Sequence, residues 1–177
     1  MMDGDIRIEP LLEDDIPALV ALARDTWVKH YTSIISLAQI EYMLAQRYDR
    51  AVILGQLHEP DVWWDKLLLD GELAAFGQYE RGKEPGTAKI DKLYARHDLR
   101  GRGLGTELLR HIEHEARSMG YSRLVLQVNK NNVSAIGAYR KNGFEVVESA
   151  VFDIGNGFVM DDFIMAKDLA ALGRFHG

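Results

Sequence analysis

Hydrophobic positions in the first third of the chain recur with a helical period. Acidic residues followed by Pro17 predict a helix start, and one apolar face follows it: Ile16, Leu19, Val20, Ala23 and Trp27. Ser36 with Gln39 three positions on is a capping-box pattern that opens a second helix. Helical character resumes over residues 49–57. A single strand precedes these helices, at residues 6–9, where apolar and charged side chains alternate.

The pattern changes from helices to strands after Pro60. Residues 62–69 and 72–81 are rich in apolar and aromatic side chains and flank Asp70-Gly71, a strong signal for a two-residue hairpin. Further strands are expected at residues 89–95, 122–128, 144–148, 151–154 and 158–166. With two more helices between them, the expected order is β-α-α-β-β-β-α-β-α-β-β, which has one strand fewer than the segments named. The chain is therefore predicted to be an α/β (α+β) protein with a mixed sheet.

An amphipathic helix follows the strand at residues 89–95. Its predicted buried face carries Leu104, Leu108, Ile112, Ala116 and Met119, with Leu109 beside them. Its predicted outer face carries Arg110, Glu113, His114 and Arg117. His111 and His114 lie three positions apart on this helix, but no third ligand accompanies them, so no metal site is expected.

A glycine-rich turn, Arg100-Gly101-Arg102-Gly103-Leu104-Gly105, joins that strand to the helix. Glycine reaches positive φ easily and lets the backbone approach a ligand. Unpaired amides at a helix N-terminus, together with two arginines, favour phosphate. The turn lacks the lysine of a Walker loop, and Thr106 stands where a dinucleotide fingerprint needs a small residue. The turn alone still leaves open a plain structural turn or a nucleotide-phosphate protein.

Composition narrows the class of protein. The 177 residues are 47% hydrophobic and 27% charged, which is ordinary for a globular protein. The absence of cysteine excludes a disulfide scaffold and a covalent cysteine intermediate. The net charge of −6 argues against a nucleic-acid partner. No apolar run has transmembrane length and no signal peptide is evident, so we expect a cytoplasmic protein without a membrane partner.

A second motif begins at Asn132 and reads Asn-Val-Ser-Ala-Ile-Gly-Ala-Tyr-Arg-Lys-Asn-Gly-Phe. Asn132, Ala135 and Tyr139 share one face of a short helix. Together with Arg100-x-x-Gly103-x-Gly105, this motif resembles the GCN5-related N-acetyltransferase (GNAT) family. The resemblance implies a GNAT-like, mostly antiparallel central sheet flanked by helices. It also implies one N-acetyltransferase domain over residues 1–177, with a cofactor-binding core at about 73–169 and acceptor-site helices at about 14–57.

The resemblance implies that acetyl-CoA is the cofactor and assigns residues to it. The diphosphate is expected on the amides of Arg102, Gly103, Leu104, Gly105 and Thr106, next to Gly101 and with Arg100 adding charge. The pantetheine arm is expected to pair with the backbone of Leu93, Tyr94 and Ala95, and a backbone N–H near Leu93 to bind the acetyl carbonyl. Asn132 and Ala135 would stand at the edge of the cofactor.

Tyr139 is the expected general acid for the departing thiolate, because a phenol can donate a proton there. The alternative is that its ring only packs under Phe144. Asp91 and Glu80 are candidates for the general base, although each is equally compatible with a surface carboxylate.

Trp27, Tyr31 and Trp64 are candidates to line the acceptor site, but aromatic residues at these spacings are also typical of a core. The sequence thus predicts transfer of acetyl from acetyl-CoA to a primary amine of a small molecule, polyamine or peptide in a ternary complex. The alternative is a catalytically silent CoA-binding regulatory module. The sequence does not identify the acceptor, the pathway or the oligomeric state, and a homodimer is one of the states compatible with it.

Overall fold

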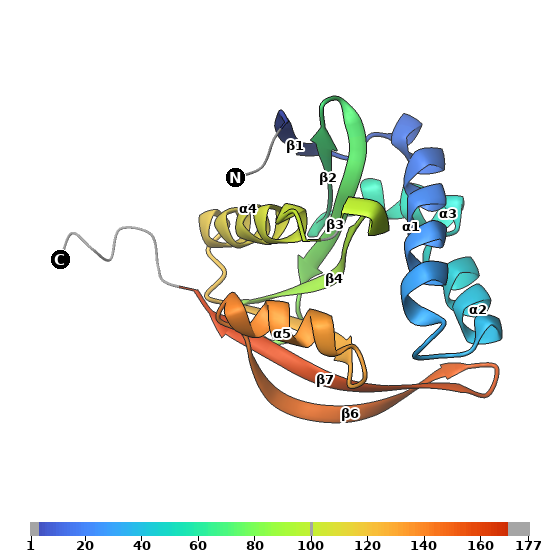
Figure 1. The fold of residues 1–177 in the computed structure, drawn as a ribbon. Coiled ribbons are helices and arrows are strands. Elements are labelled where there is room, and N and C mark those ends of the chain that lie inside the picture. The colour runs from blue at the N-terminus through green and yellow to red at the C-terminus, as the bar shows by residue number, and fades with distance from the viewer. Residues whose placement is uncertain (1–3, 100, 170–177) are drawn as a thin grey trace. The chain divides into compact units, whose positions relative to one another are not determined.

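The structure, a computed structural model, describes residues 4–99 and 101–169. Seven strands form a mixed, mostly antiparallel sheet in the order β1-β2-β3-β4-β5-β7-β6, flanked by helices (Figure 1). The strands are β1 (Ile6–Pro10), β2 (Val62–Leu69), β3 (Glu72–Arg81), β4 (Thr87–Ala95), β5 (Arg123–Asn129), β6 (Glu145–Gly155) and β7 (Phe158–Asp168). The helices are α1 (Ile16–Tyr31), α2 (Leu37–Arg47), α3 (Arg50–Leu57), α4 (Leu104–Ser118) and α5 (Val133–Lys141), with the 3₁₀ turns η1 (Glu13–Asp15) and η2 (His97–Leu99). The predicted fold class is confirmed.

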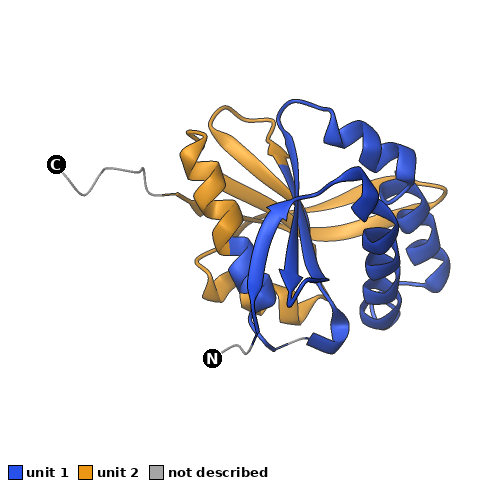
Figure 2. Ribbon diagram, turned by 90° about the horizontal axis from the view of Figure 1, so that it is seen from above, with its two compact units in different colours: residues 1–79, 92–109 blue, residues 80–91, 110–177 orange. Residues whose placement is uncertain are grey.

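Two compact units alternate along the chain, and Figure 2 colours them blue and orange. The first unit contains residues 1–79 and 92–109, and the second contains residues 80–91 and 110–177. The chain crosses between the units after residues 79, 91 and 109, so neither unit is a continuous segment.

The helix cap and the hairpin turn predicted for the first unit are both present. The Ser36 hydroxyl accepts the Gln39 N–H at 3.1 Å and begins α2. Asp70 and Gly71 have φ values of 51° and 84°, as the β2–β3 hairpin turn requires. β1 pairs antiparallel with β2, from Ile6 opposite Leu69 to Pro10 opposite Asp65. The core of this unit is aromatic and aliphatic, with Leu19, Trp27, Ile40, Ile53, Leu67 and Phe76 almost fully buried.

Strand pairing organises the second unit. β4 runs parallel to β5 from Thr87 opposite Arg123 to Ile90 opposite Leu126. β7 lies between β5 and β6 and is antiparallel to both. The segments predicted separately at 144–148 and 151–154 form one strand, β6, because a bulge between Val146 and Glu148 shifts the register without ending the pairing.

Two assignments on α4 are wrong. Met119 is 41% exposed, because the helix ends at Ser118 and its apolar face ends with it. Glu113 is buried rather than on the outer face. Lys167 of β7 donates to both of its carboxylate oxygens at 3.0 Å, and this pairing makes burial of the carboxylate tolerable.

Candidate active site

The glycine turn in the first unit has the geometry of an anion cradle. Gly101 and Gly103 have φ values of 80° and 79°, a conformation that side chains disfavour. The Glu107 N–H donates to the Gly103 carbonyl at 3.0 Å, and among the described residues this is the first hydrogen bond of the α4 ladder. A Cβ built on Gly101 or Gly105 would meet no protein atom within 4 Å. Open space beside the backbone amides of the first turn of α4 fits a phosphate group.

Charge at this turn comes from its arginines. Arg102 is exposed. Arg100, the other predicted phosphate ligand, lies outside the described residues. The amides and Arg102 alone suffice for a positive helix N-terminus.

The end of β4 lies in the same unit as the turn. Leu93, Tyr94 and Ala95 are half-buried, and the strand closes with a bond from the Arg96 N–H to the Ala74 carbonyl at 2.8 Å. The first unit therefore contains both segments that the sequence assigns to the cofactor's phosphate and its arm.

The second predicted motif lies in the second unit. Asn132 is buried and begins α5, its side chain accepting the Ala135 N–H at 3.4 Å. Tyr139 is half-buried, and its ring centroid lies 5.7 Å from that of Phe144 in an edge-on contact. The capping role of Asn132 and the Tyr139–Phe144 packing are therefore present, and a second role for either residue is compatible with them.

The two candidate bases also belong to the second unit. Asp91 and Glu80 are half-buried. The Lys89 ammonium lies 3.9 Å from the Asp91 carboxylate, which makes a loose ion pair.

The predicted acceptor aromatics lie in the core of the first unit. Trp27, Tyr31 and Trp64 are buried, and the Trp27 and Tyr31 ring centroids are 4.6 Å apart. The Trp27 indole N–H is buried, and within the described part of the chain it has no hydrogen-bond partner. Trp27 thus combines a core position with an unsatisfied donor.

Sequence reasoning missed a buried cation in this aromatic cluster. Lys92 is only 3% exposed, and its ammonium lies 5.1 Å from the Trp64 ring centroid and 5.5 Å from that of Tyr48. The ammonium also donates to the Gln78 amide oxygen at 3.2 Å. The sequence signal for the burial of Lys92 was its position between Ile90 and Tyr94, because alternate residues of a strand lie on the same face.

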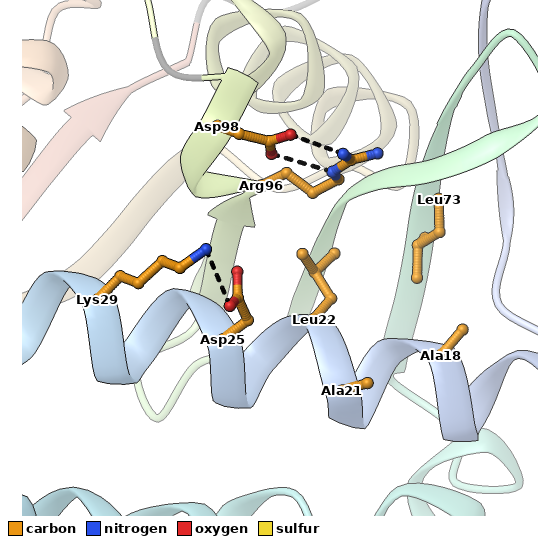
Figure 3. Close-up of a pocket in the computed structure, with 8 residues that line it drawn as sticks. All are labelled: Ala18, Ala21, Leu22, Asp25, Lys29, Leu73, Arg96 and Asp98. Carbon is orange, nitrogen blue, oxygen red and sulfur yellow. Dashed lines mark hydrogen bonds and ion pairs between the residues drawn. The ribbon is translucent and has the colours of Figure 1, made fainter.

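An open hollow of about 450 Å³ lies beside α1 in the first unit (Figure 3). Its lining is Ala18, Ala21, Leu22, Asp25, Lys29, Leu73, Arg96 and Asp98. The Arg96 guanidinium donates to both Asp98 oxygens at 3.1 and 2.7 Å, and this bonding lowers the pKa of the Asp98 carboxyl and raises that of Arg96. Neither residue was a predicted site residue.

In residues 4–99 and 101–169, no group of three or more His, Asp or Glu side chains could hold a metal ion. No helix in these ranges is long and apolar enough to cross a membrane.

The mixed α/β sheet and the glycine turn before α4 are compatible with a protein that binds a phosphate-bearing ligand. Residues 19–144 match the acetyltransferase (GNAT) family, and the chain belongs to that family. It is an acetyl-CoA-dependent N-acetyltransferase.

Three similar proteins match nearly the whole chain. A spermidine N(1)-acetyltransferase of Thermoplasma acidophilum is 25% identical over 158 residues, 88% of this chain and 96% of that protein. The crystal structure of the PaiA N-acetyltransferase of Thermoplasma acidophilum with coenzyme A is 25% identical and superposes with a TM-score of 0.80 over 93% of this chain and 99% of that one. A GCN5-related N-acetyltransferase from Rhodopseudomonas palustris shares the fold, with a TM-score of 0.80 at 23% identity over 96% of this chain and 98% of that one.

Proposed function

We propose that the acceptor is a primary amine of a small molecule and that a polyamine is the first class to test. The spermidine N(1)-acetyltransferase of T. acidophilum, with similarity over 88% of this chain, supports this choice. The unsatisfied Trp27 N–H supports a contact between the acceptor and α1, because a buried donor without a partner is costly unless a ligand meets it. Tyr31 and Trp64 complete the proposed acceptor surface.

We further propose that the glycine turn binds the cofactor's diphosphate through the amides of residues 102–106. The first-turn amides of α4 and the open space above Gly101 and Gly105 support this assignment. Arg100 enters the proposal through the sequence motif alone. The backbone of Leu93, Tyr94 and Ala95 is proposed to pair with the pantetheine arm.

The chemistry needs a proton acceptor and a proton donor. Acetyl-CoA supplies a thioester that an uncharged amine attacks, with release of the CoA thiolate. Tyr139 is proposed to protonate that thiolate, while Asp91 or Glu80 removes the proton from the amine. Asn132 and Ala135 are proposed to contact the cofactor from the first turn of α5. The transfer is direct, because the chain has no cysteine to carry the acetyl group.

Residues 1–177 are proposed to work as one domain, with a cofactor-binding core at about 73–169 and acceptor helices at about 14–57. The family match over residues 19–144 and the alternation of both units along the chain support this. Cytoplasmic location, the absence of nucleic-acid and membrane partners, and a homodimer stay predictions.

The test of the acceptor is a thiol-release assay with acetyl-CoA and a panel of amines. The panel contains spermidine, amino acids, aminoglycosides and peptides with free N-termini. We expect the highest kcat/KM for a small-molecule amine, with mass spectrometry showing one added acetyl group. Preference for a peptide N-terminus over every small amine would contradict the proposal.

A further inference from the structure

Arg96 lies between the end of β4 and the glycine turn, and its backbone N–H, its carbonyl and its guanidinium are all bonded. Its N–H donates to the Ala74 carbonyl of β3 at 2.8 Å, one residue after β4 ends. Its carbonyl accepts the Leu99 N–H at 3.0 Å and closes η2. Its guanidinium holds Asp98, inside the same turn, with two parallel bonds. The chain from residue 96 to residue 99 is thus fixed at both ends, immediately before the turn.

Acidic groups from other elements surround the same guanidinium. The Glu72 carboxylate at the start of β3 lies 3.7 Å from it, and Asp25 of α1 acts on it electrostatically. Asp25 is itself paired with Lys29 at 3.1 Å (Figure 3). Arg96 therefore ties η2 to β3 and faces α1 across the hollow.

These bonds contribute little to global stability. The Asp98 and Glu72 side chains are 58% and 81% exposed, and solvent weakens such pairs. A bidentate fork nevertheless fixes local geometry, because both N–H groups must point at one carboxylate. Fixing a loop in its bound conformation strengthens binding by reducing the entropy lost when the ligand arrives.

We propose that Arg96 is a positioning residue for acetyl-CoA: through its fork to Asp98, it holds η2 so that the glycine turn is ready for the diphosphate. This inference rests on the proposed binding of the diphosphate by that turn. Arg96 acts on the ligand only through the turn, so it affects cofactor binding and leaves the acetyl transfer itself unchanged.

The test is Arg96→Gln, with Arg24→Gln as the matched control. Arg24 forms the same two-bond fork, to Glu41, in the same unit, but away from the glycine turn. We expect Arg96→Gln to raise the KM for acetyl-CoA and the calorimetric Kd for CoA about tenfold, with kcat unchanged. Arg24→Gln should leave all three unchanged.

Acetyl-pantetheine separates positioning from a general structural defect, because it lacks the diphosphate. We expect Arg96→Gln to leave kcat/KM for acetyl-pantetheine at the wild-type value. Asp98→Asn removes the same fork without altering Arg96 and should reproduce both results, which keeps the test valid if Arg96→Gln folds poorly.

Two results would overturn the inference: an unchanged KM for acetyl-CoA in Arg96→Gln and Asp98→Asn, or an equal loss with acetyl-pantetheine. Failure of the proposed diphosphate site would give a different result. The wild-type enzyme would then use acetyl-pantetheine as well as acetyl-CoA, which would show that the diphosphate has no site at the glycine turn.

Discussion

Gly105→Glu separates the folding role of the glycine turn from its binding role. Gly105 lies inside α4 without a positive φ, and a Cβ there meets no protein atom within 4 Å. Glutamate is a better helix former than glycine by about 0.5–1 kcal/mol. An acid in the first turn adds about 0.3–1 kcal/mol through the helix dipole. The variant should therefore fold with equal or greater stability.

Binding of the cofactor should change in the opposite direction. A carboxylate at position 105 would stand in the space proposed for the diphosphate and repel it. Hydrogen bonds to a charged group are worth about 1.5–3 kcal/mol each, so losing two costs about 3–6 kcal/mol. That corresponds to a rise in the Kd for CoA of about 10²- to 10⁴-fold.

The assay is isothermal titration calorimetry with CoA, beside thermal melting of each variant. Gly55→Glu is the control, since Gly55 is also a helical glycine with no atom near its Cβ position, in α3 of the same unit. The control should bind CoA like the wild type. A Kd for Gly105→Glu within threefold of the wild type would refute the reasoning, and so would loss of its cooperative melting.

Three further predictions concern single side chains. Tyr139→Phe should lower kcat about 10²-fold with little change in the KM for acetyl-CoA; equal kinetics would mean that the phenol only packs against its neighbour. Glu41→Gln should destabilise the protein only slightly at pH 7, because solvent weakens the exposed Arg24–Glu41 pair. The Arg24 hydrogen bond lowers the pKa of the Glu41 carboxyl, so its stabilising effect is present above the ordinary value of 4.5 and is lost as pH falls through the lower folded pKa. Urea titrations should therefore show the wild type and Glu41→Gln converging in acid, and a constant difference would contradict this. Thr26→Val should raise the free energy of unfolding by about 1–2 kcal/mol, because its buried hydroxyl has no hydrogen-bond partner in the described part of the chain; a lower urea midpoint would show that the hydroxyl is satisfied.

Local signals in the sequence were sufficient for most of the fold. The Ser36 cap and the Asp70-Gly71 hairpin depend on residues a few positions apart, and both formed as predicted. The two halves of the cofactor motif likewise lie on the expected turn and helix. Their roles in binding stay predictions.

Buried charges could not be predicted, because burial depends on distant partners. Glu113 fits the polar face of α4 by periodicity, yet its partner Lys167 is 54 positions away. Lys92 lies beside Trp64 of β2 and Tyr48, the residue after α2, and only the folded unit brings these rings to β4. Arg96 was missed because a two-residue spacing to Asp98 is no recognised motif, and its meaning comes from its place before the glycine turn.

A crystal structure of the enzyme with bound CoA tests the central claim most directly. The account predicts diphosphate oxygens within about 3.2 Å of backbone N–H groups in residues 102–106. A diphosphate bound elsewhere, with the first turn of α4 facing only solvent or the protein's own side chains, would contradict it.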